Sequence, residues 1–551
     1  MFNKKIIYGL IVTVIVIIMG HQIPGQLDMT SDQRFSLSTI TKSKLDSVKS
    51  PIKIDIFLSG KLPADYLRLR SEIKTLLEVM KNKNNKITYE FIDLFEKESN
   101  MQSVISELAE FGLTPEMVYE TKNGTVNEFA VFPWAIINNG QRSVRINLLQ
   151  KNIGDTDEDK IQRSIQQLEY QIVDGLHQIM LKSKKSIAIL TSHETSNELK
   201  LTDFLQSLTP YYNLASFDLK AADITPKKTL ENLSRFDLLI ISNPKSPFTL
   251  NEKYILDQFT INGGKSLWMV NALSINRDSL FNTSGKTMGF DNELNLEDFF
   301  FKYGIRFQKK LVKDLYSAPI VIAQGSENNT NFIPLPWVYY PLPKPDMKHP
   351  LSKNIGNVLM QFVSPIDTLN TPLKKKVLIN SSDNVKTVGV PVVVNLEEAA
   401  IKINPTTFNE NKVPLAVLLE GQFESLFKNR IKPFKTTISN DQVNSKMIVV
   451  SDGNFAENQL KQGVPLELGY DKWTNNFYSN KEFLINSVHY LNDANDRIGL
   501  RSKDVNIAFL DPQKIKSKAL YWKAALIFLP LISCVIFGLI NQRYRRIKYK
   551  H

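Results

Sequence analysis

The last part of the chain constrains it most, because it contains a long apolar run with contrasting flanks. Residues 524–540 are 17 positions without a charged side chain, and the aromatic pair Tyr521 and Trp522 precedes them. A run of this length between an aromatic edge and a basic edge is typical of a transmembrane helix with a cytoplasmic tail. The alternative, a buried helix of a soluble domain, usually keeps a polar face that this run lacks. The basic edge consists of Arg543, Arg545, Arg546, Lys548 and Lys550.

A second apolar run lies at the other end of the chain. Residues 6–20 carry no charge and follow Lys4 and Lys5. They read either as a cleaved signal peptide or as a retained anchor, and we favour the anchor because no small-residue cleavage site follows. With basic residues beside both runs, the positive-inside rule places both termini in the cytoplasm and residues 24–517 on the far side. We therefore expect a two-pass membrane protein with a large extracytoplasmic body.

The net charge of +12 suggests nucleic acid as a partner only until its distribution is considered. From Asp511 onward the chain carries a net +8, and Lys4 and Lys5 add two more charges. The excess of basic residues is therefore a topology signal, and no nucleic-acid partner is expected. The single cysteine, Cys534, lies inside the C-terminal apolar run. Disulfides, cysteine-ligated zinc and a thiol nucleophile are thereby excluded from the body of the chain.

Residues 24–184 predict a thioredoxin-like α/β domain with the element order β-α-β-α-β-β-α. Residues 69–80 and 161–179 have apolar positions at helical spacing, and an Asn-Gly pair at 123–124 predicts a hairpin turn. No Cys-x-x-Cys accompanies this pattern, so only the scaffold is expected and no redox chemistry. The expected strands are residues 52–58, 87–94, 117–121 and 125–132, and the shorter helices start at Pro63 and Met101.

Residues 185–345 predict a doubly wound α/β domain. The strands expected at 186–190, 236–242 and 266–270 are continuously apolar, which is typical of a parallel sheet covered on both faces. Thr249 and Glu252 form a capping box at the start of a helix. Residues 346–510 either continue this sheet or form a smaller mixed subdomain, and residues 511–551 form a stalk, the membrane helix and the tail. Their expected elements are strands at 377–380, 388–394, 415–419 and 447–450 and a helix at 480–491.

Residues 331–345 hold five prolines interleaved with Trp337, Tyr339 and Tyr340. Proline at that density disfavours a sheet strand, so we expect an extended linker or surface loop. A polyproline ligand is the functional alternative, but the usual readers of such ligands are cytoplasmic.

The sequence lacks the common catalytic motifs. Its six histidines are scattered, with no pair spaced for a metal ion. It has no phosphate-binding loop, no dinucleotide fingerprint and no Gly-x-Ser-x-Gly elbow. We therefore expect a protein that is not an enzyme and holds no cofactor or metal. A hydrolase whose site is assembled only in three dimensions is the remaining catalytic hypothesis.

Two polar loops follow expected parallel strands and are the candidate crevice for a ligand or partner. Open α/β sheets bind ligands at the carboxyl ends of their strands, which is where these loops lie. Polar residues and glycine are also what any turn requires, and we favour that plainer interpretation. The candidate residues are Ser192, His193 and Glu194 in the first loop and Asp452 and Asn454 in the second.

Several short strings resemble the GldG family of gliding-motility-associated ABC-transporter components and the wider family of auxiliary ABC-transport proteins. The order of anchor, large exterior region, terminal span and basic tail is similar as well. The strings are residues 33–38, 164–170, 302–306, 480–484 and 500–503.

The resemblance implies an inner-membrane protein of a gliding bacterium, with its large body in the periplasm, that works with a separate ATP-binding subunit and a multispanning permease. It also implies that the second domain is similar to the GIFT domain shared with intraflagellar-transport proteins, an amidotransferase-like sheet without catalytic residues. The family supplies no catalytic residues to transfer. The stretch from Ser192 to Glu194 departs from the more glycine-rich loop of the family, which weakens a ligand role there.

Two functions from different classes remain open. One is a non-enzymatic, membrane-anchored periplasmic component of an ABC transporter. The other is a structural or scaffolding protein of a motility or envelope complex that moves no solute. A deep polar pocket beside the two candidate loops favours the first, and a filled crevice favours the second.

Overall fold

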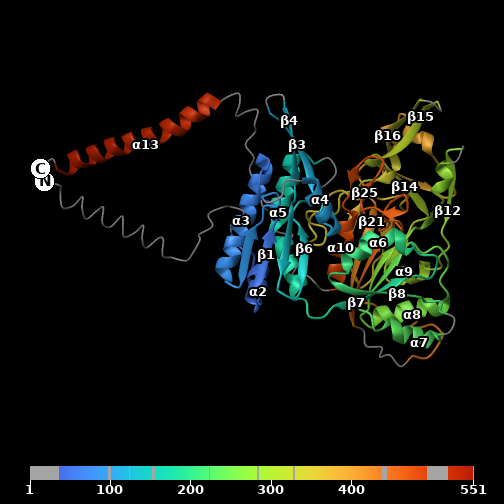
Figure 1. The fold of residues 1–551 in the computed structure, drawn as a ribbon. Coiled ribbons are helices and arrows are strands. Elements are labelled where there is room, and N and C mark those ends of the chain that lie inside the picture. Colours follow the sequence, from blue (N-terminus) through green and yellow to red (C-terminus); the bar gives the residue numbers. More distant parts are fainter. Residues whose placement is uncertain are drawn as a thin grey trace. The chain divides into compact units, whose positions relative to one another are not determined.

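The structure, a computed structural model, divides into two units at the boundary between Asp504 and Val505, and each is described by itself. Residues 36–180 of the first unit are called the first α/β region, and residues 185–492 the second α/β region (Figure 1). The predicted N-terminal span at 6–20 and the predicted stalk at 503–518 lie outside the described residues. Described are residues 36–96, 101–122, 125–151, 155–221, 224–281, 284–326, 329–436, 443–492 and 519–549.

The first α/β region is built on a four-stranded sheet in the order β2-β1-β5-β6. Strands β1 and β2 run parallel, whereas β5 is antiparallel to both β1 and β6. The apolar stripe of α3 is buried at Leu69, Ile73 and Leu77, and the stripe of α5 is buried at Ile172 and Leu176. The bounds are α2 (Thr39–Asp46), β1 (Ile52–Ile56), α3 (Ala64–Lys83), β2 (Ile87–Phe91), α4 (Met101–Glu110), β5 (Trp134–Asn138), β6 (Ser143–Asn147) and α5 (Asp157–Met180).

The two strands of the predicted hairpin exist, but they do not join the core sheet, and the turn residues 123–124 lie outside the described residues. Strands β3 (Glu116–Lys122) and β4 (Thr125–Val131) pair with each other as a separate two-stranded sheet. The core sheet instead takes β5 and β6, a second hairpin whose turn contains Gly140. Burial explains the choice, since Ala135, Ile137 and Ile146 are buried and Tyr119 of β3 is exposed.

The second α/β region contains a seven-stranded sheet with helices on both faces. Five of its strands, β8, β7, β9, β10 and β22, are mutually parallel. Strand β21 is antiparallel to β22, and β18 is antiparallel to β21. Strands β18, β21 and β22 come from beyond residue 345, so the later part of the chain completes the sheet. The spatial order is β18 (Lys374–Asn380), β21 (Pro414–Gln422), β22 (Asn444–Val450), β10 (Lys265–Met269), β9 (Leu238–Ser242), β7 (Lys185–Leu190) and β8 (Tyr212–Phe217).

Two apolar clusters cover the two faces of this sheet. All five residues of β9 are buried, as expected for a strand with helices on both sides. One cluster contains Phe204 of α6 and Phe483 of α10, and the other contains Tyr254 of α8 and Phe299 of α9. The predicted capping box of Thr249 and Glu252 begins α8. The helices are α6 (Glu198–Leu208), α7 (Pro226–Leu233), α8 (Leu250–Ile261), α9 (Glu297–Lys302) and α10 (Asn480–Leu491).

The proline-rich stretch is a strand, so the predicted linker is wrong. Strand β16 (Asn329–Pro341) pairs antiparallel with β15 (Ser317–Ser326). In such a ribbon only every second N–H points toward the partner, and Pro334 and Pro336 are two residues apart. Both prolines can therefore occupy positions that donate nothing to β15. Trp337 and Tyr339 are fully buried in a third apolar cluster, which places them in a core and leaves no polyproline ligand to present.

The predicted strand at 388–394 is divided in two. Strand β19 (Val385–Gly389) pairs with β14 (Lys310–Asp314), whereas β20 (Val392–Asn395) pairs with β12 (Lys286–Asp291). Pro391 lies between them and has no N–H to donate to either ladder, which explains the break. The other small strands here are β11 (Leu273–Ile275), β13 (Ile305–Phe307) and β17 (Ile366–Thr368).

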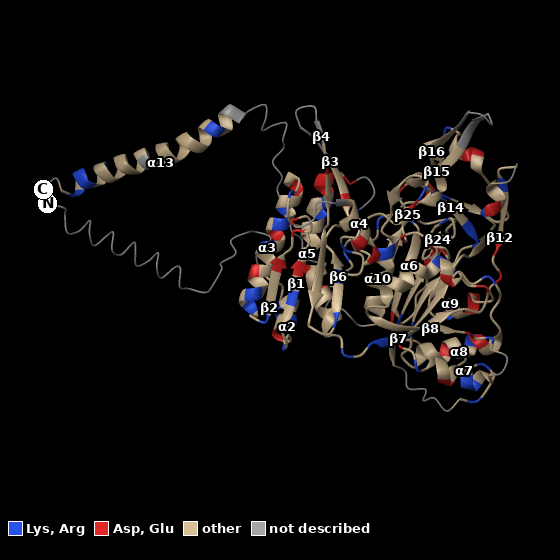
Figure 2. Cartoon of the chain, viewed as in Figure 1, with Lys and Arg blue, Asp and Glu red and all other residues tan. Residues whose placement is uncertain are grey.

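The second unit contains α13 (Ala519–Lys548), the helix expected at the C-terminus. Residues 521–548 have a mean hydropathy of 2.4 over their most apolar window. By length and composition this helix can cross a membrane. Figure 2 shows an uncharged stretch of this helix with basic residues toward its C-terminal end. Arg543, Arg545 and Arg546 lie there, and Tyr521 and Trp522 lie in its first turn.

Candidate functional site

The carboxyl ends of the parallel strands β7, β9, β10 and β22 share one edge of the large sheet, and polar residues join them there. The Asn271 side chain, after β10, donates to Asn243 (3.1 Å) and to Asn454 (3.2 Å) and accepts from the Gly453 N–H (2.7 Å). A Cβ on Gly453 would lie 2.5 Å from Asn243 Oδ1, so glycine is required for this close approach. The side chains that follow β9, β10 and β22 are therefore hydrogen-bonded to one another at this edge of the sheet.

The first predicted loop, with Ser192, His193 and Glu194, packs against neighbouring segments. His193 is buried, its ring stacks on Phe248 at a centroid distance of 3.8 Å, and its Nε2 lies 3.2 Å from Glu252 Oε2. Its Nδ1 lies 3.0 Å from the hydroxyl of Ser192, which accepts the Leu219 N–H. Glu194 is exposed, and both it and His193 have positive φ, of 52° and 63°. Ser192 and His193 therefore tie the loop to the start of α8.

Glu252 has a pKa below its ordinary value because of this cluster. Burial acts to raise the pKa of this carboxyl, but hydrogen bonds from His193 and from the Thr249 backbone and hydroxyl outweigh burial. The carboxylate is thus held ionised at the N-terminus of α8, where a negative charge is favourable. This is the role of a helix cap, and none of Ser192, His193 and Glu194 lines the cavity described next.

The second predicted loop, after β22, does line a cavity, of about 590 Å³. Asp452 and Asn454 both face it. Asp452 is only 1% exposed, and its two carboxyl oxygens accept the N–H groups of Gln361 (2.8 Å) and Asn454 (2.9 Å). Burial raises the pKa of Asp452 to about 7, although those two hydrogen bonds act to lower it. Near neutral pH this carboxyl can therefore either donate or accept a proton in a hydrogen bond.

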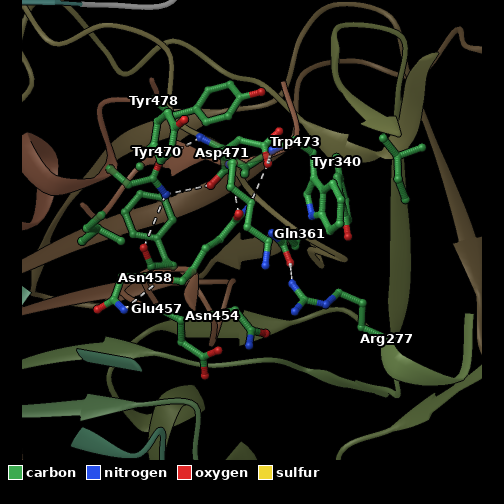
Figure 3. Close-up of a pocket in the computed structure, with 18 of the residues that line it drawn as sticks. Arg277, Tyr340, Gln361, Asn454, Glu457, Asn458, Tyr470, Asp471, Trp473 and Tyr478 are labelled. Carbon is green, nitrogen blue, oxygen red and sulfur yellow. Dashed lines mark hydrogen bonds between the residues drawn. The ribbon is translucent and has the colours of Figure 1, made fainter. Parts of the chain in front are cut away.

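Residues from distant parts of the chain complete the cavity, as Figure 3 shows for Arg277, Gln361 and Trp473 among others. Arg277 precedes the short helix at 278–281, Tyr340 comes from β16, and Trp473 lies between the short strands at 470–471 and 476–477. Arg277 donates to Gln361 Oε1 at 3.4 Å. Other lining residues are Lys200, Phe281, Pro319, Ile320, Val321, Phe332, Leu359, Phe455, Glu457, Asn458, Gln459, Leu460, Leu468, Gly469, Tyr470, Asp471, Lys472, Tyr478 and Asn480.

Glu457 joins the two loops of the sheet edge to the cavity. Its carboxylate accepts hydrogen bonds from the Ser196 hydroxyl (2.6 Å) and from the Lys200 ammonium (3.1 Å), and Asn243 donates to it at 3.3 Å. Burial acts to raise the pKa of Glu457, but the Ser196 hydrogen bond and the Lys200 charge hold the pKa below its ordinary value. The loop after β7 therefore meets the loop after β22 at Ser196, four residues beyond Ser192.

The segment carrying Trp473 is held by Asp471. This carboxylate accepts from the side chain of Gln459 (3.1 Å), the Trp473 N–H (3.3 Å) and the Thr474 hydroxyl (2.5 Å). Gly469 has a φ of +92°, and a Cβ there would lie 2.0 Å from the carbonyl oxygen of Tyr478, so no other residue fits. Trp473 is thus an exposed aromatic ring on a fixed turn.

Of the residues that line the cavity, the sequence predicts Asp452 and Asn454 as candidates but gives no indication of Arg277, Gln361 and Trp473. The first pair follows an apolar strand, which is a local signal. The other three lie in separate loops whose meeting depends on long-range packing. A tryptophan in a polar turn is the one local feature of this group, and a single exposed apolar side chain is too common on protein surfaces to indicate a site by itself.

The described residues contain no group of three or more His, Cys, Asp or Glu side chains placed to hold a metal ion. The cavity is lined by polar groups such as Asp452 and Asn454, by apolar side chains such as Leu359 and Phe455, and by the exposed ring of Trp473.

Comparison with known proteins gives the context of this cavity. A family model described as "ABC-type uncharacterized transport system" (ABC_transp_aux) matches residues 184–487, more than half of the chain. The chain belongs to this family. The match covers the whole second α/β region except its last residues, so the cavity lies inside the family domain of this ABC-transport auxiliary protein.

Three further findings complete the comparison. A domain of unknown function (DUF7088) matches residues 31–138, which covers most of the first α/β region. None of the curated proteins matches the chain. A solved structure described as "mmIFT52 N-terminal domain" is 14% identical, with 56% of this chain and 97% of that chain covered and a TM-score of 0.33. At that score the likeness carries no statement about this fold.

Proposed function

We propose that this protein is a non-enzymatic, membrane-anchored periplasmic component of an ABC transport system. The observation that carries the proposal is the family match over residues 184–487 in a chain whose sequence has no phosphate-binding loop. A member of an ABC system without that loop needs a separate ATP-binding subunit for energy. Its partners are then that subunit, a multispanning permease and the membrane.

The anchoring follows from α13 and its flanking residues. Tyr521 and Trp522 suit the outer interface and Arg543, Arg545 and Arg546 suit the cytoplasmic side, which supports an orientation with the C-terminus inside. Lys4 and Lys5 support a cytoplasmic N-terminus in the same way. Both α/β regions would then lie in the periplasm of a bacterium with an inner membrane.

The two α/β regions suit a binding role without chemistry. The order β2-β1-β5-β6, with one parallel pair, supports the thioredoxin-like interpretation of the first region, and no cysteine is present there for redox work. The parallel sheet of the second region supports an amidotransferase-like, GIFT-type scaffold that lacks its cysteine nucleophile. We extend the role to gliding motility on the strings shared with the GldG family.

The experiment is purification of the full chain in mild detergent, with a tag after His551, followed by mass spectrometry of the proteins recovered. A permease and a nucleotide-binding subunit should be enriched over a tagged single-span membrane protein prepared in parallel. Recovery of envelope or motility proteins without either subunit would instead support the scaffold, the second function considered. The cavity beside Asp452 and Asn454 supports the transport role. The first candidate loop is instead filled by the contact of His193 with Phe248 and Glu252, which is the arrangement that a scaffold predicts.

A further inference from the structure

We propose that the cavity of the second α/β region binds a neutral saccharide. The proposal deepens the proposed function, because it names the solute class that an auxiliary transport protein would capture. Three features carry it: an aromatic rim, a polar floor and a balance of charges.

The rim consists of three aromatic side chains left largely in solvent. Phe281 is 62% exposed, Phe332 66% and Trp473 63%, and all three line the cavity. They come from the short helix after Arg277, from β16 and from the turn held by Asp471. Flat apolar rings at the mouth of a pocket offer surfaces for the C–H face of a sugar ring, since their faces carry partial negative charge and attract polarised C–H groups.

The floor consists of polar groups able to donate and to accept. Asp452 is almost fully buried, and Tyr340 is 8% exposed. Gln361 and Arg277 stand beside them, joined by one hydrogen bond that leaves further guanidinium and amide N–H groups available. Sugar hydroxyls both donate and accept, so carboxyl, phenol and amide groups together match a saccharide better than they match a ligand that only accepts.

The charges in the cavity argue for a neutral ligand. Three basic residues line it, namely Lys200, Arg277 and Lys472, and three acidic ones, namely Asp452, Glu457 and Asp471. Lys200 forms an ion pair with Glu457. Lys472 donates to the carbonyl oxygen of Leu460 at 2.8 Å and lies 5.1 Å from the centre of the Trp473 ring. With Lys200 paired to Glu457, the charges of Arg277 and Lys472 are opposed by Asp471 and, when it is ionised, by Asp452, so a charged ligand meets only a small net charge.

The size of the cavity agrees with this occupant. Its volume of about 590 Å³ falls within the range of small-molecule sites, roughly 300–1,000 Å³. The turn that carries Trp473 is also held in place, since Asp471 accepts hydrogen bonds from the Trp473 backbone N–H and the Thr474 hydroxyl. A preorganised aromatic surface lowers the entropic cost of binding.

The test is isothermal titration calorimetry on the purified full chain in detergent, without permease or ATPase. The probes are glucose, galactose, mannose, N-acetylglucosamine, cellobiose and maltose, with glucuronate and triglycine as comparison ligands, each at concentrations up to about 10 mM. At least one should bind with a Kd of about 1 mM or below. Because the chain is titrated alone, a failure here leaves the transporter role standing, and a failure to recover transport partners leaves the binding result standing.

Variants make the test specific. Trp473→Ala should weaken binding at least about tenfold, and Gln361→Ala should weaken it several-fold, as expected for central contacts of a site. Tyr119→Ala is the matched control, because Tyr119 is also 63% exposed but lies on β3 in the first α/β region. Binding equal to wild type in both Trp473→Ala and Gln361→Ala would overturn the proposal. No binding of any neutral sugar, or binding of glucuronate or triglycine alone, would overturn it as well.

Discussion

Replacing Trp337 by alanine is expected to lower the free energy of unfolding by about 3–5 kcal/mol, the usual loss for a fully buried large aromatic side chain. Trp337 is 0% exposed, and its ring centroid lies 5.1, 4.9 and 5.7 Å from those of Tyr339, Tyr340 and Phe362. Its indole N–H also donates to the Asn395 carbonyl at 3.3 Å. Truncation therefore leaves a cavity and an unmatched acceptor. Pulse proteolysis of the full chain in detergent across a urea series measures the loss.

Trp473→Ala provides the matched control for that measurement. Trp473 is exposed, so its loss should change the free energy of unfolding by roughly 0.5 kcal/mol or less. If the proline-rich stretch were a surface linker, the two tryptophan variants would behave alike. Equal stabilities of Trp337→Ala and wild type would thus contradict the placement of β16 in a core.

Asp452→Asn is expected to remove a destabilising effect that grows between about pH 4 and pH 7. The ordinary pKa of 3.8 is raised to about 7 in the folded protein, so the folded state binds a proton more tightly than the unfolded state does. Stability from this group therefore falls as pH rises through that window and stays constant above it. A shift of that size corresponds to about 4 kcal/mol. The free energy of unfolding of Asp452→Asn should therefore increase relative to that of the wild type by an amount of this order between pH 4 and pH 8.

Asp298→Asn is the control with the opposite sign. Burial acts to raise the pKa of Asp298, but hydrogen bonds from Lys253 and Arg430 hold it below its ordinary value. Its contribution is present above the unfolded pKa and is lost as pH falls. The stability difference for this variant should therefore change mainly at acid pH. A difference between Asp452→Asn and wild type that does not change with pH would contradict the buried, protonatable carboxyl.

Much of the large sheet could be predicted because its signals are local. Strands β7, β9, β10 and β22 are short apolar runs, and the residues Thr249 and Glu252 mark the start of α8. The four-stranded sheet of the first region was harder to predict, because two neighbouring hairpins, β3–β4 and β5–β6, could each have joined it. Burial of Ile137 and Ile146 against α5 decided between them, and that contact is not visible in a single segment.

Strand β16 shows a different failure. The density of prolines predicts a linker, but each proline removes only its own backbone N–H donor. A two-stranded ribbon leaves half of its backbone N–H groups without a partner strand, so prolines fit at those positions. The aromatic residues between the prolines were the better guide, because Trp337 and Tyr339 needed a core.

The candidate site was predictable only in part. Asp452 and Asn454 follow a strand at the ligand-binding edge of the sheet, and the structure brings them to the cavity. Ser192 and His193 follow β7 at the same edge, but they turn into the contact with Phe248 and Glu252. Strand ends therefore indicated the right edge of the sheet and could not separate a capping cluster from a cavity wall.

ATP hydrolysis by the material purified on the His551 tag tests the transporter role most directly. The sequence of this chain has no phosphate-binding loop, so any hydrolysis has to come from a recovered subunit. We predict vanadate-sensitive ATPase activity that is absent from the single-span control protein prepared in parallel. A pure, stable preparation of this chain with no ATPase activity and no permease would contradict the assignment to an ABC transport complex.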